Sequence, residues 1–152
     1  MHVVLVNPLI PPNTGNISRL CAGTNTDLHL VGKLGFSLDD RYLKRAGLDY
    51  WPHVKLHLHE TLEEVLVLAG DAPVAFLSSH AARPYTRFEP TPEGWLVFGC
   101  ETTGLGPVVR EAEAARLYRV PITEHVRSLN LANTVAVVLY DCLRRLSFPF
   151  DA

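Results

Sequence analysis

Several features that would assign this chain to a large protein class are missing from its sequence. Its three cysteines are an odd number and include no CxxC pair, which is the pattern of a reduced compartment. The longest uncharged apolar run, residues 129–140, is too short to span a bilayer and contains asparagine and threonine. The N-terminal segment MHVVLVNPL has neither the basic region nor the long apolar core of a signal peptide. We therefore expect a cytoplasmic protein with no membrane partner.

A net basic charge is missing as well. The chain has 14 Lys and Arg residues against 16 Asp and Glu residues, which gives a formal net charge of −2. It is therefore not a generally basic nucleic-acid-binding protein, and any RNA contact has to use a local patch. The length of 152 residues, with 47% hydrophobic and 20% charged residues, fits one globular domain. Because no repeat or linker divides the chain, residues 1–152 are expected to form that single domain.

Short apolar runs of strand-forming residues alternate along the chain with helical patterns. The runs expected to form strands are 3–6, 28–31, 54–58, 74–77, 95–98 and 117–120. The segments expected to form helices are 14–26, 39–46, 61–69, 107–114 and 130–146, the third with capping-box spacing between Thr61 and Glu64. Most of the apolar runs are continuous, as in parallel strands buried on both faces. We therefore predict a doubly wound α/β fold with a mostly parallel sheet flanked by helices.

The last predicted helix carries more apolar surface than one buried face needs. One stripe at helical spacing contains Leu131, Val135, Val138, Cys142 and Leu146, and further apolar residues extend beyond it: Ala136, Val137, Tyr140 and Leu143. We infer that the sheet covers one side of this helix and a second subunit the other. The sequence therefore predicts a homodimer.

Four loops that follow predicted strands have unusual compositions. They read NPLIPPNTGNISR after the first strand, SSHAARP after the fourth, GCETTGLGP after the fifth and PITEHVRSLN after the sixth. In open α/β sheets, ligands bind at the carboxyl ends of the strands. Glycine lets a backbone approach a ligand closely, and proline fixes the shape of a loop. We expect a nucleotide-like ligand held largely by main-chain hydrogen bonds, although the dinucleotide fingerprint, the Walker loop and the nucleophile elbow are all missing.

The histidines of HVKLHLHE allow two interpretations. By the period of two, His53, His57 and His59 lie on the same side of a predicted strand, and an H-x-H pair on a strand can ligate zinc. An edge strand with a solvated face explains the same histidines together with Lys55. Because no third-ligand motif accompanies the pair, we do not expect a metal.

Four segments together resemble a known family. They read IPPNTGNISRLCA, GFSLDDRYLKRAGLDYW, FGCETTGL and VRSLNLANTVAVVLY. In this order, over nearly the whole chain, they resemble the SPOUT superfamily, and more narrowly the TrmL-type tRNA 2′-O-methyltransferases that modify the wobble nucleotide. The resemblance implies a C-terminal trefoil knot, S-adenosylmethionine bound in a bent shape in the knotted loops, and a site completed across a homodimer.

The resemblance also implies roles for individual residues. Those expected at the cofactor are Leu77, Gly99, Glu101, Val120, Ile122, Ser128 and Asn130, of which Glu101 and Asn130 would brace the loops. Arg19, preceded by Asn13, matches the arginine assigned to catalysis.

Basic side chains near these positions are candidates for tRNA contact. Arg127 adjoins the SLN turn, and Arg41, Lys44 and Arg45 share one face of a predicted helix. Family members often read GPETRGL where this chain reads GCETTGL, so the missing arginine at Thr103 weakens a role in RNA contact for that loop.

The implied chemistry limits what the arginine can do. A ribose 2′-hydroxyl becomes a good nucleophile only as its proton leaves, whereas a guanidinium stays protonated in proteins. We therefore expect Arg19 to stabilise the developing alkoxide or to bind a neighbouring phosphate.

Each of these residues also has a purely structural interpretation. Arg19 could be solvated, Asn13, Ser128 and Asn130 could be simple helix caps, and Glu101 could only hold its own loop in place. The alternative functions are a 2′-O-methyltransferase acting on ribosomal RNA or another tRNA position, and a non-catalytic nucleotide-binding module.

Overall fold

The computed structural model describes residues 1–39 and 49–151. Its strands are β1 (His2–Val6), β2 (Asp27–Val31), β3 (Lys55–His59), β4 (Val74–Leu77), β5 (Trp95–Phe98) and β6 (Leu117–Tyr118). Its α-helices are α1 (Pro11–Gly23), α3 (Leu62–Ala69), α4 (Gly106–Ala112) and α5 (Leu131–Arg145). Short 3-10 helices lie at η1 (Trp51–His53), η2 (Tyr85–Arg87) and η3 (Ala114–Arg116).

Within this described part, the strands form one sheet in the order β3-β2-β1-β5-β4-β6, and every pair is parallel. The chain builds one half of the sheet outward from β1 and then crosses to the other side of β1 to build the second half. The strand order therefore reverses between β1 and β5, which is where open α/β sheets bind their ligands. This topology confirms the predicted doubly wound α/β fold.

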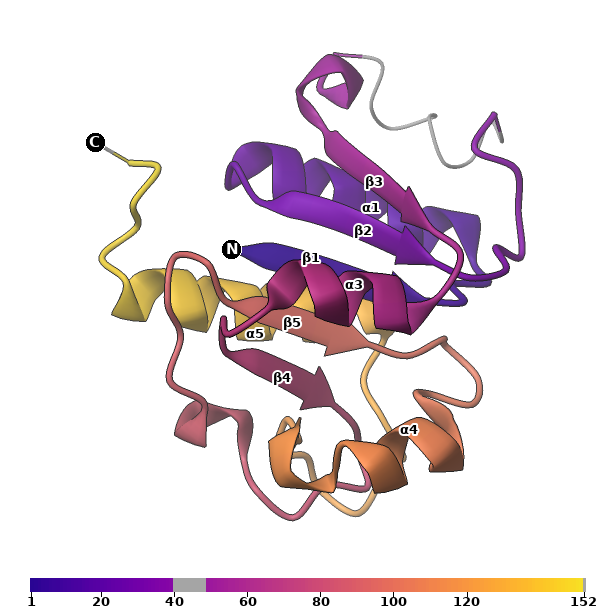
Figure 1. Ribbon diagram of the computed structural model, residues 1–152, viewed down its shortest axis with the longest axis vertical. Helices are drawn as coiled ribbons and strands as arrows, with labels where there is room; N and C mark the ends of the chain where they lie inside the picture. The colour runs from indigo at the N-terminus through magenta and orange to yellow at the C-terminus, as the bar shows by residue number, and fades with distance from the viewer. Residues whose placement is uncertain (40–48, 152) are drawn as a thin grey trace.

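Helices cover both faces of the sheet (Figure 1). On one face, α1 and α5 pack together, and Ile17 and Val138 join the sheet in one buried core. On the other face, Val65 of α3 and Val109 of α4 pack against a second apolar cluster. Strands β4 and β5 are buried along their whole length, which explains why their sequences are continuously apolar.

Helix α5 has one buried side and one exposed side. Val135, Val138 and Cys142 are buried, as the apolar stripe predicts. Val137 and Tyr140 remain 43% and 45% exposed on the single chain. The surplus apolar surface inferred from the sequence therefore lies on the outside of this helix.

The first helix begins earlier than the sequence analysis predicts. It starts at Pro11 rather than at 14, because proline is well suited to the first helical positions, where its missing N–H costs no hydrogen bond. Asn13 therefore lies inside the helix and is only 6% exposed, so its interpretation as a simple N-cap is wrong. Helix α3, by contrast, begins as predicted: the Thr61 hydroxyl accepts a hydrogen bond from the Glu64 amide at 3.3 Å.

Strand β3 lies at an edge of the sheet, and Lys55 and His57 are 49% and 45% exposed there. This edge position agrees with the solvated-strand interpretation. His53 lies in η1, outside the strand, so it does not share a strand face with the other two histidines. Among the described residues, no helix is long and apolar enough to cross a bilayer.

Candidate active site

A cavity of about 590 Å³ lies at the carboxyl ends of β4, β5 and β6. Its walls come from the loops that follow these strands and from the start of α5. The volume is in the range of small-molecule and cofactor sites. The predicted residues that line the cavity are Leu77, Gly99, Glu101, Val120, Ile122, Arg127 and Ser128. The structure thus brings together side chains from three separate loops that the sequence analysis assigned to one site.

Gly99 allows the loop after β5 to fold back on itself. The amide of Cys100 donates to the Gly104 carbonyl at 3.2 Å, and the Gly104 amide donates back to the Cys100 carbonyl at 3.0 Å. A Cβ atom on Gly99 would lie 2.0 Å from the carbonyl carbon of Gly104, far inside van der Waals contact. Only glycine therefore fits at this position, and the closed turn gives the cavity one of its walls.

Glu101 connects this turn to the start of α1. Its Oε2 accepts the Leu9 amide at 2.8 Å, and its Oε1 accepts the Ile10 amide at 3.0 Å. Ile10 is the N-cap of α1 and makes no side-chain capping hydrogen bond of its own. The carboxylate therefore caps a helix about 90 residues earlier in the chain, where the helix dipole also favours negative charge.

Asn13 extends the connection to α5. Its Nδ2 donates to Glu101 Oε1 at 3.3 Å, and its Oδ1 accepts from Asn130 Nδ2 at 3.0 Å. Asn130 also caps α5 through its Oδ1, which accepts the Asn133 amide at 3.3 Å. Asn130 is not among the cavity-lining residues, so the geometry supports the bracing role for it and for Glu101.

The loop after β6 leaves main-chain groups available to a ligand. Within the described residues, the amides and carbonyls of Val120, Ile122 and Ser128 form none of the backbone hydrogen bonds found in turns and loops. All three residues line the cavity. A purine-bearing ligand recognised by main-chain groups, as S-adenosylmethionine would be, therefore fits the residues present.

Arg19 lies outside the cavity of its own chain. It is exposed on α1, and its guanidinium carbon lies 5.9 Å from the centre of the Tyr50 ring. The Tyr50 hydroxyl donates to the Gly15 carbonyl at 3.0 Å, which ties that ring to the same helix. Arg41, Lys44 and Arg45 lie outside the described residues, whereas Arg127 is exposed at the cavity.

Comparison with known proteins identifies the family and the fold. The model of the SpoU rRNA methylase family matches residues 1–140. The chain belongs to this family. It is 44% identical to the tRNA (cytidine(34)-2′-O)-methyltransferase of Polaromonas sp. over 152 residues, which cover 97% of this chain and 92% of that protein. The family resemblance drawn from the sequence motifs is therefore confirmed, and the chain is an enzyme of the methylase class.

Two solved structures resemble this methylase along nearly its whole length. One, an RNA methyltransferase fold from Bacillus anthracis, is 45% identical with a TM-score of 0.91, covering 99% of this chain and 98% of that one. The other, from work on "the 2-OH methylation of C/U34 on tRNA", is 40% identical with a TM-score of 0.87, covering 96% and 95%.

The sequence analysis missed one charged residue of the methylase cavity. Arg110 on α4 lines the cavity, and its Nε donates to the Gly106 carbonyl at 3.2 Å. It supplies a guanidinium to the same cavity that Thr103 lines. In the sequence, Arg110 follows the GLGP segment by about one helical turn. This spacing indicates a cavity residue only when the position of α4 is known.

Cys100 is a second departure from the family pattern. Burial acts to raise the pKa of its thiol, but hydrogen bonds with Thr103 and Thr102 outweigh burial, and the pKa is lowered overall. The Sγ atom lies 3.0 Å from the Thr103 hydroxyl. The Thr103 side chain therefore stabilises the same turn that Gly99 permits.

Proposed function

We propose that this methylase transfers a methyl group from S-adenosylmethionine to the ribose 2′-hydroxyl of the wobble pyrimidine nucleotide of tRNA. The observation that carries the proposal is the shared cavity, which two of the family segments, FGCETTGL and VRSLNLANTVAVVLY, line together with the ends of β4 and β6. Relatives that are 40–44% identical over nearly the whole chain, and that are named for or studied in this reaction, support the choice of substrate.

The cofactor would occupy the cavity at the carboxyl ends of β4–β6. Main-chain groups of Val120 and Ile122 would hold the adenine, and Leu77, Gly99 and Ser128 would enclose the rest. When bound, S-adenosylmethionine supplies an electrophilic methyl group on a sulfonium. Glu101 and Asn130 keep the surrounding loops in place through Asn13. The C-terminal trefoil knot stays a prediction from the family resemblance.

Arg19 would act on the cavity of a second copy of the chain. Its exposure on α1, away from its own cavity, fits a residue that completes a neighbouring site. In the proposed transfer, the ribose oxygen would take the methyl group, the neutral thioether of the cofactor would be the leaving group, and water or a phosphate oxygen would accept the hydroxyl proton. The guanidinium stabilises the negative charge that develops on the oxygen, or holds the adjacent phosphate with paired donors.

The exposed side of α5 is the surface proposed to form the homodimer. Val137 and Tyr140 lie on it, and Val126 and Leu129 of the preceding loop are 50% and 38% exposed. Several exposed apolar side chains on one helix and its preceding loop favour an interface there. Sedimentation of a Val137→Asp variant should show monomers, whereas Val67→Asp, on exposed α3 surface, should leave the dimer intact. A monomeric unmodified chain would contradict the proposal.

The tRNA surface would combine basic residues of both copies. Arg127 lies at the cavity, and Arg41, Lys44 and Arg45 are the further candidates from the sequence. Each phosphate contact makes RNA binding depend on salt concentration. With tRNA as the substrate, we expect the reaction to take place in the cytoplasm.

The experiment that tests the function uses S-adenosylmethionine labelled in its methyl group. The protein is incubated with total tRNA and, separately, with ribosomal RNA, and the label is located by nuclease mapping of the products. We expect label in tRNA, on the ribose of the wobble nucleotide. Label only in ribosomal RNA, or at another tRNA position, would favour the second enzyme hypothesis. Cofactor binding with no transfer to either RNA would leave a non-catalytic nucleotide-binding module.

A further inference from the structure

A group of histidines from three neighbouring strands lies on the sheet face that α3 covers. His2 is the first residue of β1, and its Nδ1 lies 3.0 Å from Nε2 of His29 on β2. The other ring nitrogen of His29, Nδ1, lies 2.9 Å from Nε2 of His59 on β3. The parallel register explains this contact, because His29 pairs with His57 and the next residue on that face of β3 is His59. Three strands thus contribute imidazoles to one continuous chain of contacts.

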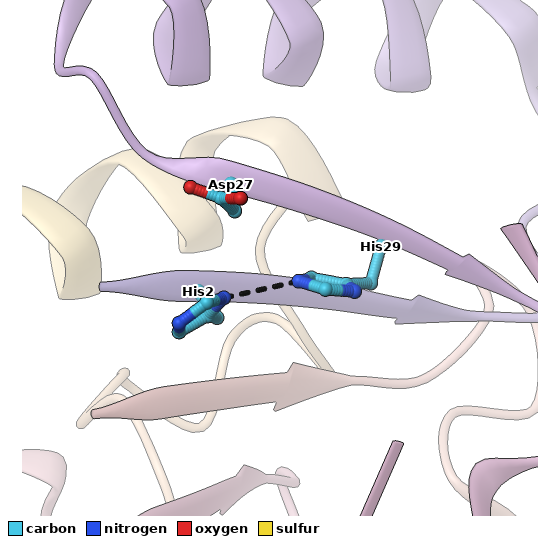
Figure 2. A group of neighbouring side chains, drawn as sticks. All are labelled: His2, Asp27 and His29. Carbon is cyan, nitrogen blue, oxygen red and sulfur yellow. Dashed lines mark hydrogen bonds between the residues drawn. The ribbon is translucent and has the colours of Figure 1, made fainter. Parts of the chain in front are cut away.

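A carboxylate completes the group. Asp27 is the first residue of β2 and pairs in register with His2. One ligand atom each from His2, Asp27 and His29 lies within 4.8 Å of the others. Figure 2 shows these three side chains, with the hydrogen bond between the two imidazoles. Two imidazoles and one carboxylate are the donor set of many transition-metal sites.

The two imidazoles lie in an enclosed part of this sheet face, where His2 is half-buried. His29 is only 3% exposed, so its ring nitrogens have little access to solvent water.

We propose that His2, Asp27 and His29 bind a divalent transition-metal ion of the zinc type. In a tetrahedral zinc site with Zn–N bonds of ~2.0–2.1 Å, two ligand nitrogens are about 3.3 Å apart. The His2 and His29 nitrogens, at 3.0 Å, need to separate only slightly for an ion to replace their shared proton. The Asp27 side chain is 26% exposed and can approach as the third ligand, and water completes the coordination.

Neighbouring side chains hold these ligands in the orientation that a metal needs. His29 Nδ1 can donate to His59, whose own Nδ1 lies 3.9 Å from Glu64 Oε2 on α3. His57 Nε2 lies 2.8 Å from Asp27 Oδ2. Contacts of this kind fix the ring orientation and tautomer of metal-bound histidines.

Trp95 holds the imidazole ring of His2 in place by stacking. Its indole stacks on His2 with ring centres 4.0 Å apart and planes 8° apart. Trp95 begins β5, whereas Gly99 follows its end, so the metal site and the cofactor cavity are separated by the strand length of about 10 Å or more. The ion would therefore stabilise the starts of β1 and β2 and take no part in methyl transfer.

The test uses the full chain without a histidine tag, stripped of metal by a chelator and then titrated with Zn²⁺. We expect one Zn²⁺ per chain, measured by competition with a chromophoric chelator and by elemental analysis after dialysis. His2→Ala and Asp27→Asn should each weaken binding by at least about tenfold, since even outer partners of a metal site contribute about 10–100-fold. Co²⁺ in place of Zn²⁺ should give visible absorption bands that both variants lose.

The matched control is His53→Ala, which removes an exposed histidine of η1, outside the cluster. It should bind Zn²⁺ as the unmodified chain does. The proposal fails if the unmodified chain binds less than one equivalent, if His53→Ala lowers the affinity as much as His2→Ala, or if both ligand variants keep full affinity. Circular dichroism of each variant shows whether it is folded, and Asp27→Asn decides the result if His2→Ala is not.

Discussion

The two ends of β5 carry two different kinds of site. At its carboxyl end, Gly99 opens a turn whose main chain lines the cofactor cavity. At its start, Trp95 stacks on His2, in a cluster built from side chains of neighbouring strands. A site made of main chain needs glycine and proline in its loops, and these are visible in a sequence. A site made of strand side chains depends on register, which a sequence does not display.

Removing the guanidinium proposed to act at the cavity of the second copy should have the largest effect on methyl transfer. Arg19→Ala is expected to slow methyl transfer by about 10²–10³-fold, because charge on the ribose oxygen loses its stabilising donor. S-adenosylmethionine affinity should change little, because Arg19 is proposed to act on the ribose oxygen or its phosphate and not on the cofactor. Single-turnover transfer to tRNA and calorimetric cofactor binding measure the two quantities.

Arg19→Lys and Arg87→Ala serve as controls for this prediction. Lysine keeps the charge but not the paired donors, so it should recover only part of the rate. Arg87→Ala removes an exposed cation on η2 and should keep most of the rate. Near-normal turnover in Arg19→Lys would exclude bidentate contact, and normal turnover in Arg19→Ala would exclude Arg19 from the mechanism.

Adding one methyl group at the turn tests the main-chain wall of the cavity. Gly99→Ala would place a Cβ 2.0 Å from the Gly104 carbonyl carbon, so the turn has to open. Overpacking costs about 1–3 kcal/mol, and if this cost falls on the ligand-binding conformation, cofactor binding weakens by about 5–150-fold. Gly23→Ala is the control, because nothing lies within 4 Å of the Cβ that it adds. Equal affinities of the two variants, measured by calorimetry, would contradict this account of the turn.

Neutralising the carboxylate between the loop and α1 should lower stability. In the structure, each carboxylate oxygen of Glu101 accepts one backbone amide, from Leu9 or Ile10. Glu101→Gln replaces one of these oxygens with an NH₂ group, which cannot accept a hydrogen bond. We expect a loss of about 1–3 kcal/mol in the free energy of unfolding, measured with urea. Glu89→Gln, at a carboxylate 87% exposed beside Arg145, should change stability by less than about 1 kcal/mol. If both variants unfolded at the same urea concentration, the hydrogen bonds between Glu101 and the start of α1 would not contribute to stability.

The smallest effect is expected on the face of the sheet that holds the histidines. Thr61→Ala removes the hydroxyl that caps α3 and should cost about 1 kcal/mol of stability. Cofactor affinity should stay the same, because α3 does not line the cavity. Thr61→Ser keeps the hydroxyl and should restore most of the stability. A drop in cofactor affinity with Thr61→Ala would show that the two regions are not independent.

The sequence predicts the elements whose signals are local. The bounds predicted for β4 and β5, 74–77 and 95–98, agree with the structure because each is a continuous apolar run. Strand β6 was expected at 117–120 but ends at Tyr118, since beyond it only an isolated bridge joins Pro84 and Arg119. At the start of α1, proline and asparagine gave competing signals, and proline determines where the helix begins.

The contacts that shape the candidate site are less predictable. Family motifs point to Glu101 and Asn130, but no local pattern reveals that Asn13 lies between them. The cluster of His2, Asp27 and His29 is harder still to predict from the sequence. His2, Asp27 and His29 have unremarkable neighbours in the sequence, and only the pairing of β1 with β2 brings them together.

The hydrogen bonds from Glu101 through Asn13 to Asn130 have a mechanical consequence. One carboxylate supports the first turn of α1, and one amide joins that turn to the first turn of α5. A ligand that displaces the Cys100–Leu105 turn must therefore move both helices or break these bonds. Since α5 also presents Val137 to the proposed second copy, filling the cavity and pairing two chains would become thermodynamically linked in that homodimer. By reciprocity, whichever event comes first alters the affinity of the other by the same factor.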